Sequence, residues 1–79
     1  MQVHVKLHAS LRKYLPAGAL DDTVVLDLPP GARVGDVVAA LGIPTNHAKI
    51  AVVNGQQSDF DAVLQGGEQV SLFPPLAGG

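Results

Sequence analysis

The sequence predicts a small α+β roll in which a mixed sheet of four to five strands packs on one main helix. Three observations support this class. Four short runs have the apolar alternation or β-branched content of strands, one run has the apolar stripe of a helix, and the chain has 79 residues, which suffices for one compact domain. A domain of this size has no room for a deep, enclosed substrate pocket, so its chemistry is expected at the surface.

The N-terminal third carries two predicted strands. In residues 2–7, Val3, Val5 and Leu7 alternate with polar residues, which indicates a strand with one face on the core. Residues 23–28 show a similar pattern and end before two prolines and a glycine. The inward residues of this second strand are Val24, Leu26 and Leu28. The two strands are expected to pair as a hairpin.

Helical segments are predicted at two places. Residues 9–15 hold good helix formers and stop at Pro16, which indicates a short helix or turn. Residues 33–41 form the main helix, because their apolar residues recur at three- and four-residue spacing. These apolar residues are Val34, Val37, Val38 and Leu41. Asp36 suits the first turn of this helix, and Gly42 suits a left-handed end.

The C-terminal half carries the other strands. Residues 49–53 are predicted as a third strand with Ile50 and Val52 facing the core, and Asn54-Gly55 is a strong hairpin-turn signal. After a polar stretch and a tight turn at residues 66–68, the last strand is predicted over residues 69–73. Its inward residues are Val70 and Leu72.

The order of these elements predicts the topology. If the last strand lies parallel to the first, a right-handed crossover through the main helix closes the core. The result is the β-grasp fold of ubiquitin-like proteins. We expect residues 1–73 to form this domain and residues 74–79 to form an extended tail.

Composition excludes several classes of function. The chain is 47% hydrophobic and 15% charged, with a net charge of −2 and no basic cluster larger than Arg12-Lys13, which argues against nucleic-acid binding. No cysteine is present, so disulfides, thiolate ligands and cysteine nucleophiles are excluded. The longest apolar run in the body, residues 50–53, is far too short to span a bilayer. We expect a cytoplasmic protein without membrane contact.

The histidines are weak candidates for a metal site. His4 and His8 share the outward face of the first strand by parity, whereas His47 lies far along the chain. No carboxylates are patterned around them, so the expectation is a solvated strand face and no metal.

The tail is the candidate chemical feature. It follows Phe73 and reads Pro74-Pro75-Leu76-Ala77-Gly78-Gly79. The paired prolines stiffen the exit in an extended direction, and alanine and glycine make a thin tip that fits a narrow channel in another enzyme. We expect the α-carboxylate of Gly79 to be the reacting group. It is ionised at neutral pH, so it needs adenylation by ATP before a sulfur or nitrogen nucleophile attacks it.

Two plainer interpretations stand beside this one. Chain ends are often rich in glycine simply because disorder is tolerated there. Phe73 is expected to point away from the core face of Val70, where it serves either as half of a docking patch or as packing at the strand end.

These residues resemble the MoaD/ThiS family of ubiquitin-like sulfur carriers, and within it the MoaD branch, the small subunit of molybdopterin synthase. The segment from Phe73 to Gly79 is similar to the ending Phe-Pro-Pro-Val-Ala-Gly-Gly of that branch. Residues 9–12, 52–55 and 67–70 are similar to the family's Ala-x-Leu-Arg, Val-Asn-Gly and Gly-Asp/Glu-Glu-Val stretches. His8 departs from the pattern, since an aromatic residue usually stands there, and residues 66–69 lack the usual acidic pair.

The resemblance implies a carrier and no enzyme activity of its own. An adenylating partner enzyme would use ATP to activate Gly79, a sulfurtransferase system would convert the carboxylate to a thiocarboxylate, and the large subunit of molybdopterin synthase would consume the sulfur. Phe73 to Gly78 would contact these partners, and the chain would hold no cofactor. Two alternatives are a carrier for thiamine, cysteine, siderophore or tRNA thiolation and a modifier that forms isopeptide bonds through Gly79. A third is a β-grasp module that only binds partners.

Overall fold

The computed structural model describes residues 1–75. Its elements, in chain order, are β1 (Gln2–Leu7), the 3₁₀ helix η1 (Ala9–Tyr14), β2 (Thr23–Asp27), α1 (Val34–Ala40), β3 (Ile50–Val53), β4 (Gln56–Ser58) and β5 (Gln69–Phe73). Within these residues, no helix is both long and apolar enough to cross a membrane.

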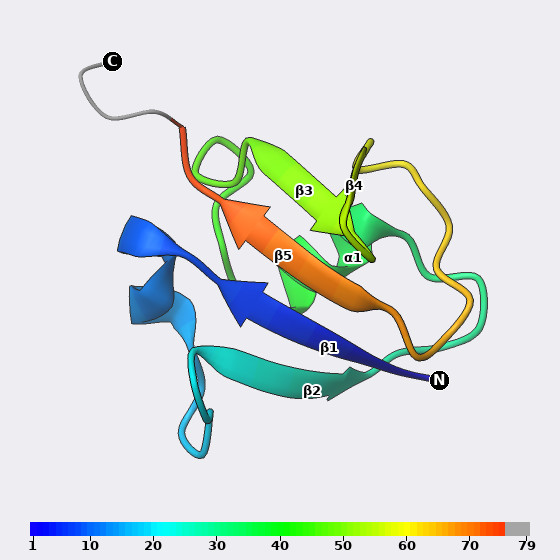
Figure 1. Ribbon diagram of the computed structural model, residues 1–79, viewed down its shortest axis with the longest axis horizontal. Helices are drawn as coiled ribbons and strands as arrows, with labels where there is room; N and C mark the ends of the chain where they lie inside the picture. Colours follow the sequence, from blue (N-terminus) through cyan, green and yellow to red (C-terminus); the bar gives the residue numbers. More distant parts are fainter. Residues whose placement is uncertain (76–79) are drawn as a thin grey trace.

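The strands form one five-stranded mixed sheet in the order β2-β1-β5-β3-β4. β5, the last strand, lies in the middle, parallel to β1 and antiparallel to β3 (Figure 1). β2 pairs antiparallel with β1, and β4 pairs antiparallel with β3. The predicted β-grasp fold, a mixed sheet with one main helix, is therefore confirmed.

α1 packs on one face of the sheet and closes the core. Its predicted stripe is confirmed, because Val34, Val37 and Val38 are buried. Gly42 has φ +73°, the left-handed conformation expected just beyond a helix end. The inward residues of β1 and β5 are fully buried; they are Val3, Val5, Leu7, Val70 and Leu72.

The prediction that Ile50 and Val52 face the core is wrong. Ala51 is 1% exposed, and Val53 packs against the core cluster. The register gives the reason: Ala51 pairs with the buried Leu72, whereas Ile50 pairs with Phe73 on the outer face. All four residues of β3 are apolar, so alternation could not reveal which of them point inward.

The fifth strand, β4, was not located from the sequence. It has the polar sequence Gln-Gln-Ser and lies at the sheet edge, where neither apolar alternation nor burial is required. The preceding Asn54-Gly55 turn is confirmed, with φ of +51° and +84°, the left-handed conformation that such turns need.

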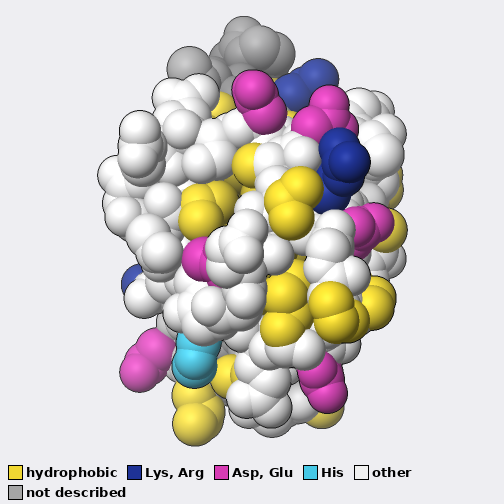
Figure 2. Space-filling model, turned by 90° about the vertical axis from the view of Figure 1, so that its right-hand side faces the viewer, with side chains coloured by type: hydrophobic (Ala, Val, Ile, Leu, Met, Phe, Trp, Pro, Cys, Tyr) yellow, Lys and Arg dark blue, Asp and Glu magenta, His cyan; other side chains and the backbone are white. Residues whose placement is uncertain are grey.

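The described surface carries few exposed large apolar side chains. They are Leu20, Val25 and Val63. On the face shown in Figure 2, hydrophobic side chains of the described residues lie in separate groups among polar and acidic ones. This face therefore differs from the broad apolar patch that marks many stable interfaces.

Candidate functional site

The end of β5 defines the candidate site. Because β5 is parallel to β1 and antiparallel to β3, the ends of β1 and β5 and the start of β3 meet at one end of the sheet (Figure 1). Leu7 pairs with Leu72, and Ile50 pairs with Phe73. We call this the tail-bearing end, because Pro74 and Pro75 follow directly.

Phe73 is held on both sides at the tail-bearing end. The N–H of Lys49 donates to the carbonyl of Phe73 at 3.0 Å, and the N–H of His8 donates to the carbonyl of Leu72 at 3.2 Å. The Phe73 ring is half-buried and stacks on the His8 ring, with centroids 4.1 Å apart and planes 14° apart. Phe73 therefore points away from the core face of Val70, as predicted, and one side of its ring is already covered.

His8 is in an environment that favours its neutral form. Burial lowers the pKa of His8 below its ordinary value of 6.5, and the charge of Lys6 lowers it further, whereas Asp22 acts in the opposite direction. Its Nε2 atom is buried and has no hydrogen-bond partner within residues 1–75. His4 is exposed on the same outer face, as the parity of β1 predicts.

A second contact between a histidine and an aromatic side chain lies at the tail-bearing end. The Tyr14 hydroxyl and His47 Nδ1 are hydrogen-bonded at 2.9 Å, and the Lys13 ammonium lies 5.4 Å from the centroid of the Tyr14 ring. This bond links η1, which follows β1, to the segment before β3. Sequence reasoning missed it, since the partners are 33 positions apart and no periodic pattern connects them.

The tail is described only at its base. Pro74 is half-buried and Pro75 is exposed. The predicted contact residues Leu76, Ala77 and Gly78 and the predicted reacting residue Gly79 lie outside the described residues, so their roles stay predictions. What the structure adds is the point from which they leave, the centre of one end of the sheet.

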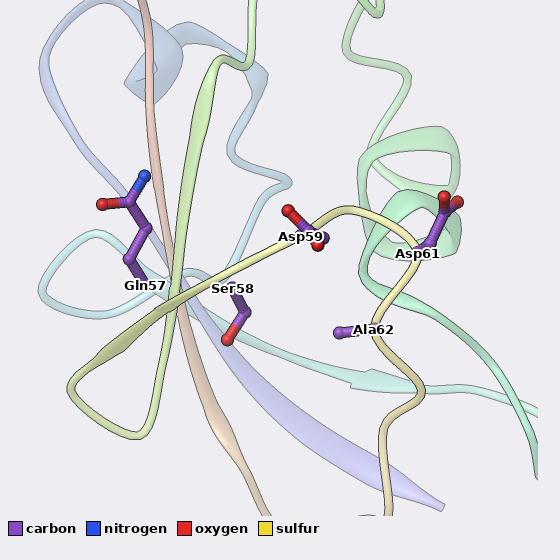
Figure 3. A pocket seen from close by; sticks show the side chains of 5 residues that line it. All are labelled: Gln57, Ser58, Asp59, Asp61 and Ala62. Carbon is purple, nitrogen blue, oxygen red and sulfur yellow. The ribbon is translucent and has the colours of Figure 1, made fainter.

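Hollows elsewhere on the described surface offer weaker candidates. One is lined by Gln57, Ser58, Asp59, Asp61 and Ala62. Figure 3 shows Ser58 pointing away from Asp59 and Asp61, so these groups do not converge on one point. A second, apolar hollow lies between α1 and Phe60 and carries no charged side chain in its lining. Among the described residues, no three His, Asp or Glu side chains are grouped as metal ligands.

The fold and its tail define a class of protein. A β-grasp sheet whose central strand leads into Pro-Pro and then toward Gly-Gly is a ubiquitin-like protein of the MoaD/ThiS type. The chain belongs to the Mut7-C ubiquitin family, whose family model matches residues 1–77. It matches no curated protein.

Solved structures agree with this assignment. SAMP1 from Haloferax volcanii is 28% identical with a TM-score of 0.73, and the match covers 100% of both chains. The Pyrococcus furiosus protein assigned as molybdopterin converting factor subunit 1 is 28% identical with a TM-score of 0.71, covering 95% of this chain and 98% of that one. The Haloferax volcanii protein HVO 2177 is 27% identical with a TM-score of 0.75, covering 100% and 87%. Small ubiquitin-like proteins of this type are carriers or modifiers and not enzymes.

Proposed function

We propose that the chain is a sulfur carrier that reacts through the C-terminal carboxylate of Gly79. One observation carries this proposal: the central strand of the sheet ends at Phe73 and continues into Pro74-Pro75, so the sequence Leu-Ala-Gly-Gly starts from a rigid point at the edge of the molecule. A thin segment that starts there can enter a partner's active site while the body docks outside it.

The proposed chemistry has two steps. A Gly79 carboxylate oxygen attacks the α-phosphorus of ATP in the adenylating partner, and pyrophosphate leaves. A sulfide-level sulfur from a sulfurtransferase system then attacks the acyl carbon and displaces AMP, which leaves a thiocarboxylate. The partner supplies the ATP site, so the carrier needs no cofactor of its own.

For the destination of the sulfur we propose molybdopterin. The tail differs from the usual MoaD ending at a single position, Leu76. The likeness to the Pyrococcus furiosus protein also favours this pathway. In this role the chain would be the small, non-catalytic subunit that delivers sulfur to the large subunit of molybdopterin synthase.

Intact mass spectrometry tests the carrier function. The protein is incubated with its host's adenylating enzymes, ATP and a sulfur donor, and we expect the mass shift of a thiocarboxylate. Deleting Gly78-Gly79 should abolish the shift, whereas Leu76→Val, which gives the usual MoaD ending, should retain it. A full-length chain that stays unmodified with all partners present, or a mature protein that extends beyond Gly79, would contradict the proposal.

Reconstitution tests the pathway. Thiocarboxylated protein and the large synthase subunit should convert the precursor to the dithiolene of molybdopterin, and the Gly78-Gly79 deletion should not. If the thiocarboxylate forms but no dithiolene appears, the carrier serves another pathway such as thiamine, cysteine or tRNA thiolation.

A second candidate is a protein modifier that forms isopeptide bonds through Gly79. The equal similarity to SAMP1, whose name denotes a small archaeal modifier protein, favours it. A ladder of conjugates in host lysate that disappears when Gly79 is deleted would support this function, and the absence of such a ladder would count against it.

A further inference from the structure

The turn that follows β4 separates two hollows of different character. Phe60 lines an apolar hollow along α1, whereas its neighbours Asp59 and Asp61 line the adjoining hollow, which we call the acidic hollow (Figure 3). Main-chain hydrogen bonds hold this turn. The N–H of Ala62 donates to the carbonyl of Asp59 at 3.1 Å, and the N–H of Gly35 donates to the carbonyl of Phe60 at 2.8 Å. The wall between the hollows is therefore fixed to the start of α1.

The apolar hollow is large enough for a side chain of a partner. Its volume of about 370 Å³ lies in the range of small-ligand pockets, so it can hold a whole aromatic ring. Its lining contains buried apolar residues, which are Val38, Ile43 and Ala48, and exposed residues, which are Ala39, Pro44 and Thr45. An apolar side chain that enters it gains the free energy of burial without displacing a charge.

The acidic hollow gives the surroundings a negative charge. Asp59 and Asp61 are exposed, and within residues 1–75 neither carboxylate lies within ion-pair distance of a base. Asp36 adds a third exposed carboxylate at the start of α1. Arg33 lies beside the turn, but its guanidinium donates to the main-chain carbonyl of Asp61 at 3.4 Å. Lys49, which follows Ala48 in the chain, is the other base near the lining.

This charge selects among the occupants of the apolar hollow. A second copy that paired through the same face would bring the carboxylates of both copies together. An anionic membrane surface or a nucleic acid would be repelled for the same reason. A cationic partner is attracted, because its charge complements the unpaired carboxylates.

We propose that the two hollows together bind a protein segment in which a large apolar residue stands two positions from a lysine or arginine. In an extended segment, side chains two positions apart point to the same side and lie ~7 Å from each other. This spacing suits a wall made by the single residue Phe60, with the apolar side chain on one side and the basic side chain near Asp59 and Asp61. The inference goes beyond the proposed function, since it involves neither Gly79 nor the tail.

A peptide titration followed by NMR tests the proposal. The probe is the blocked peptide acetyl-Gly-Trp-Gly-Arg-Gly-amide, added to the full-length protein at low ionic strength. We expect saturable shifts of the main-chain signals of Ala39, Thr45, Asp59, Phe60 and Asp61. A peptide with Ala in place of Trp should bind about tenfold more weakly. A peptide with Glu in place of Arg should bind about two- to fivefold more weakly, the effect of an exposed ion pair.

Matched variants assign each half of the site. Asp59→Asn combined with Asp61→Asn should remove the preference for the Arg peptide over the Glu peptide, whereas Asp21→Asn should retain it. Ala39→Gln should weaken binding of both Trp peptides, because it places a longer polar side chain at the apolar hollow. Ala40→Gln, on the same helix but outside the lining, should bind as the native protein does. All five positions are exposed, so the fold should be kept.

Three results would overturn the proposal. They are the absence of saturable shifts, shifts confined to other parts of the protein, and equal binding of the Arg and Glu peptides to the native chain. The last result would show an apolar hollow without a preference for charge. Each of these results leaves the carrier function untouched, and failure of Gly79 to become adenylated would leave the peptide site untouched.

Discussion

Glu68 holds the turn that leads into β5, and the residue is only 9% exposed. Its carboxylate oxygens accept main-chain hydrogen bonds from Gln65 and Gly66, each 2.6 Å long. Burial raises the pKa of Glu68, but these hydrogen bonds and one from its own N–H outweigh burial, so the pKa lies below the ordinary 4.5. The ionised form therefore stabilises the fold above pH 4.5, and this contribution is lost as the pH falls through the lowered value.

Replacing Glu68 with Gln should lower the free energy of unfolding by about 1–2 kcal/mol at neutral pH, because a neutral amide oxygen is a weaker acceptor. The difference from the native protein should shrink as the pH falls below about 4.5. Chemical denaturation at several pH values measures both effects. The matched control is Asp59→Asn at an exposed carboxylate, which should change little. A Glu68→Gln penalty that persists unchanged in acid would contradict the role of the carboxylate charge.

His8 has a linkage of the same sign as Glu68, at a higher pH. Its pKa is lowered in the folded state, so the unfolded chain binds the proton more tightly. The native protein should lose stability relative to His8→Phe as the pH falls through the unfolded value of 6.5, and the loss should level off below the folded-state pKa. Unfolding curves of both proteins across this range provide the measurement. Parallel stability profiles would show that His8 titrates alike in both states.

At the scale of the element, sequence patterns identified structure where one face is apolar and the other polar. The stripe of α1 and the alternation of β1 gave the correct inward residues for this reason. The inward residues of β3 were predicted wrongly because each of its residues is apolar, and β4 was not predicted because each of its residues is polar. In both strands, pairing with the neighbouring strand decides the orientation, and pairing is a property of the fold.

The corrected orientation of β3 can be tested with an isosteric pair. Val53→Thr places a hydroxyl against the core and should cost about 1–2 kcal/mol of unfolding free energy. Val52→Thr places the same group on the outer face and should change it by less than about 0.5 kcal/mol. Urea denaturation of the two variants decides the matter, and a larger penalty at Val52 would restore the original prediction.

Only part of the candidate site could be predicted from the sequence. The tail was visible in the sequence, because its prolines and glycines are consecutive. The His8–Phe73 stack and the Tyr14–His47 bond were not, because each depends on which strands are neighbours at the tail-bearing end. The aromatic character that the family usually has at position 8 was the one available signal for the first pair.

At the scale of the whole molecule, β5 joins the two halves of the sheet. β2 and β1 lie on one side, and β3 and β4 lie on the other. Val70 and Leu72 of β5 are both 0% exposed. The domain is therefore incomplete without its last strand.

Two truncations test this point. A chain that ends at Gly67 should not fold, because it lacks β5 and leaves β1 and β3 without their shared neighbour. A chain that ends at Pro75 should keep the free energy of unfolding of the full protein to within about 0.5 kcal/mol. Circular dichroism and two-dimensional NMR spectra of both chains give the answer. A folded chain ending at Gly67 would contradict the central position of β5.

The parallel pairing of β1 and β5 also determines how the molecule bears mechanical load. A force that pulls the tail away from Met1 acts along the strand axes, so it shears the ladder, and the hydrogen bonds between the two strands share the load simultaneously. A pull across the ladder would instead break them one after another. A pull between Met1 and the end of β5 therefore loads the ladder in shear, and the domain should resist it better than a pull across the ladder.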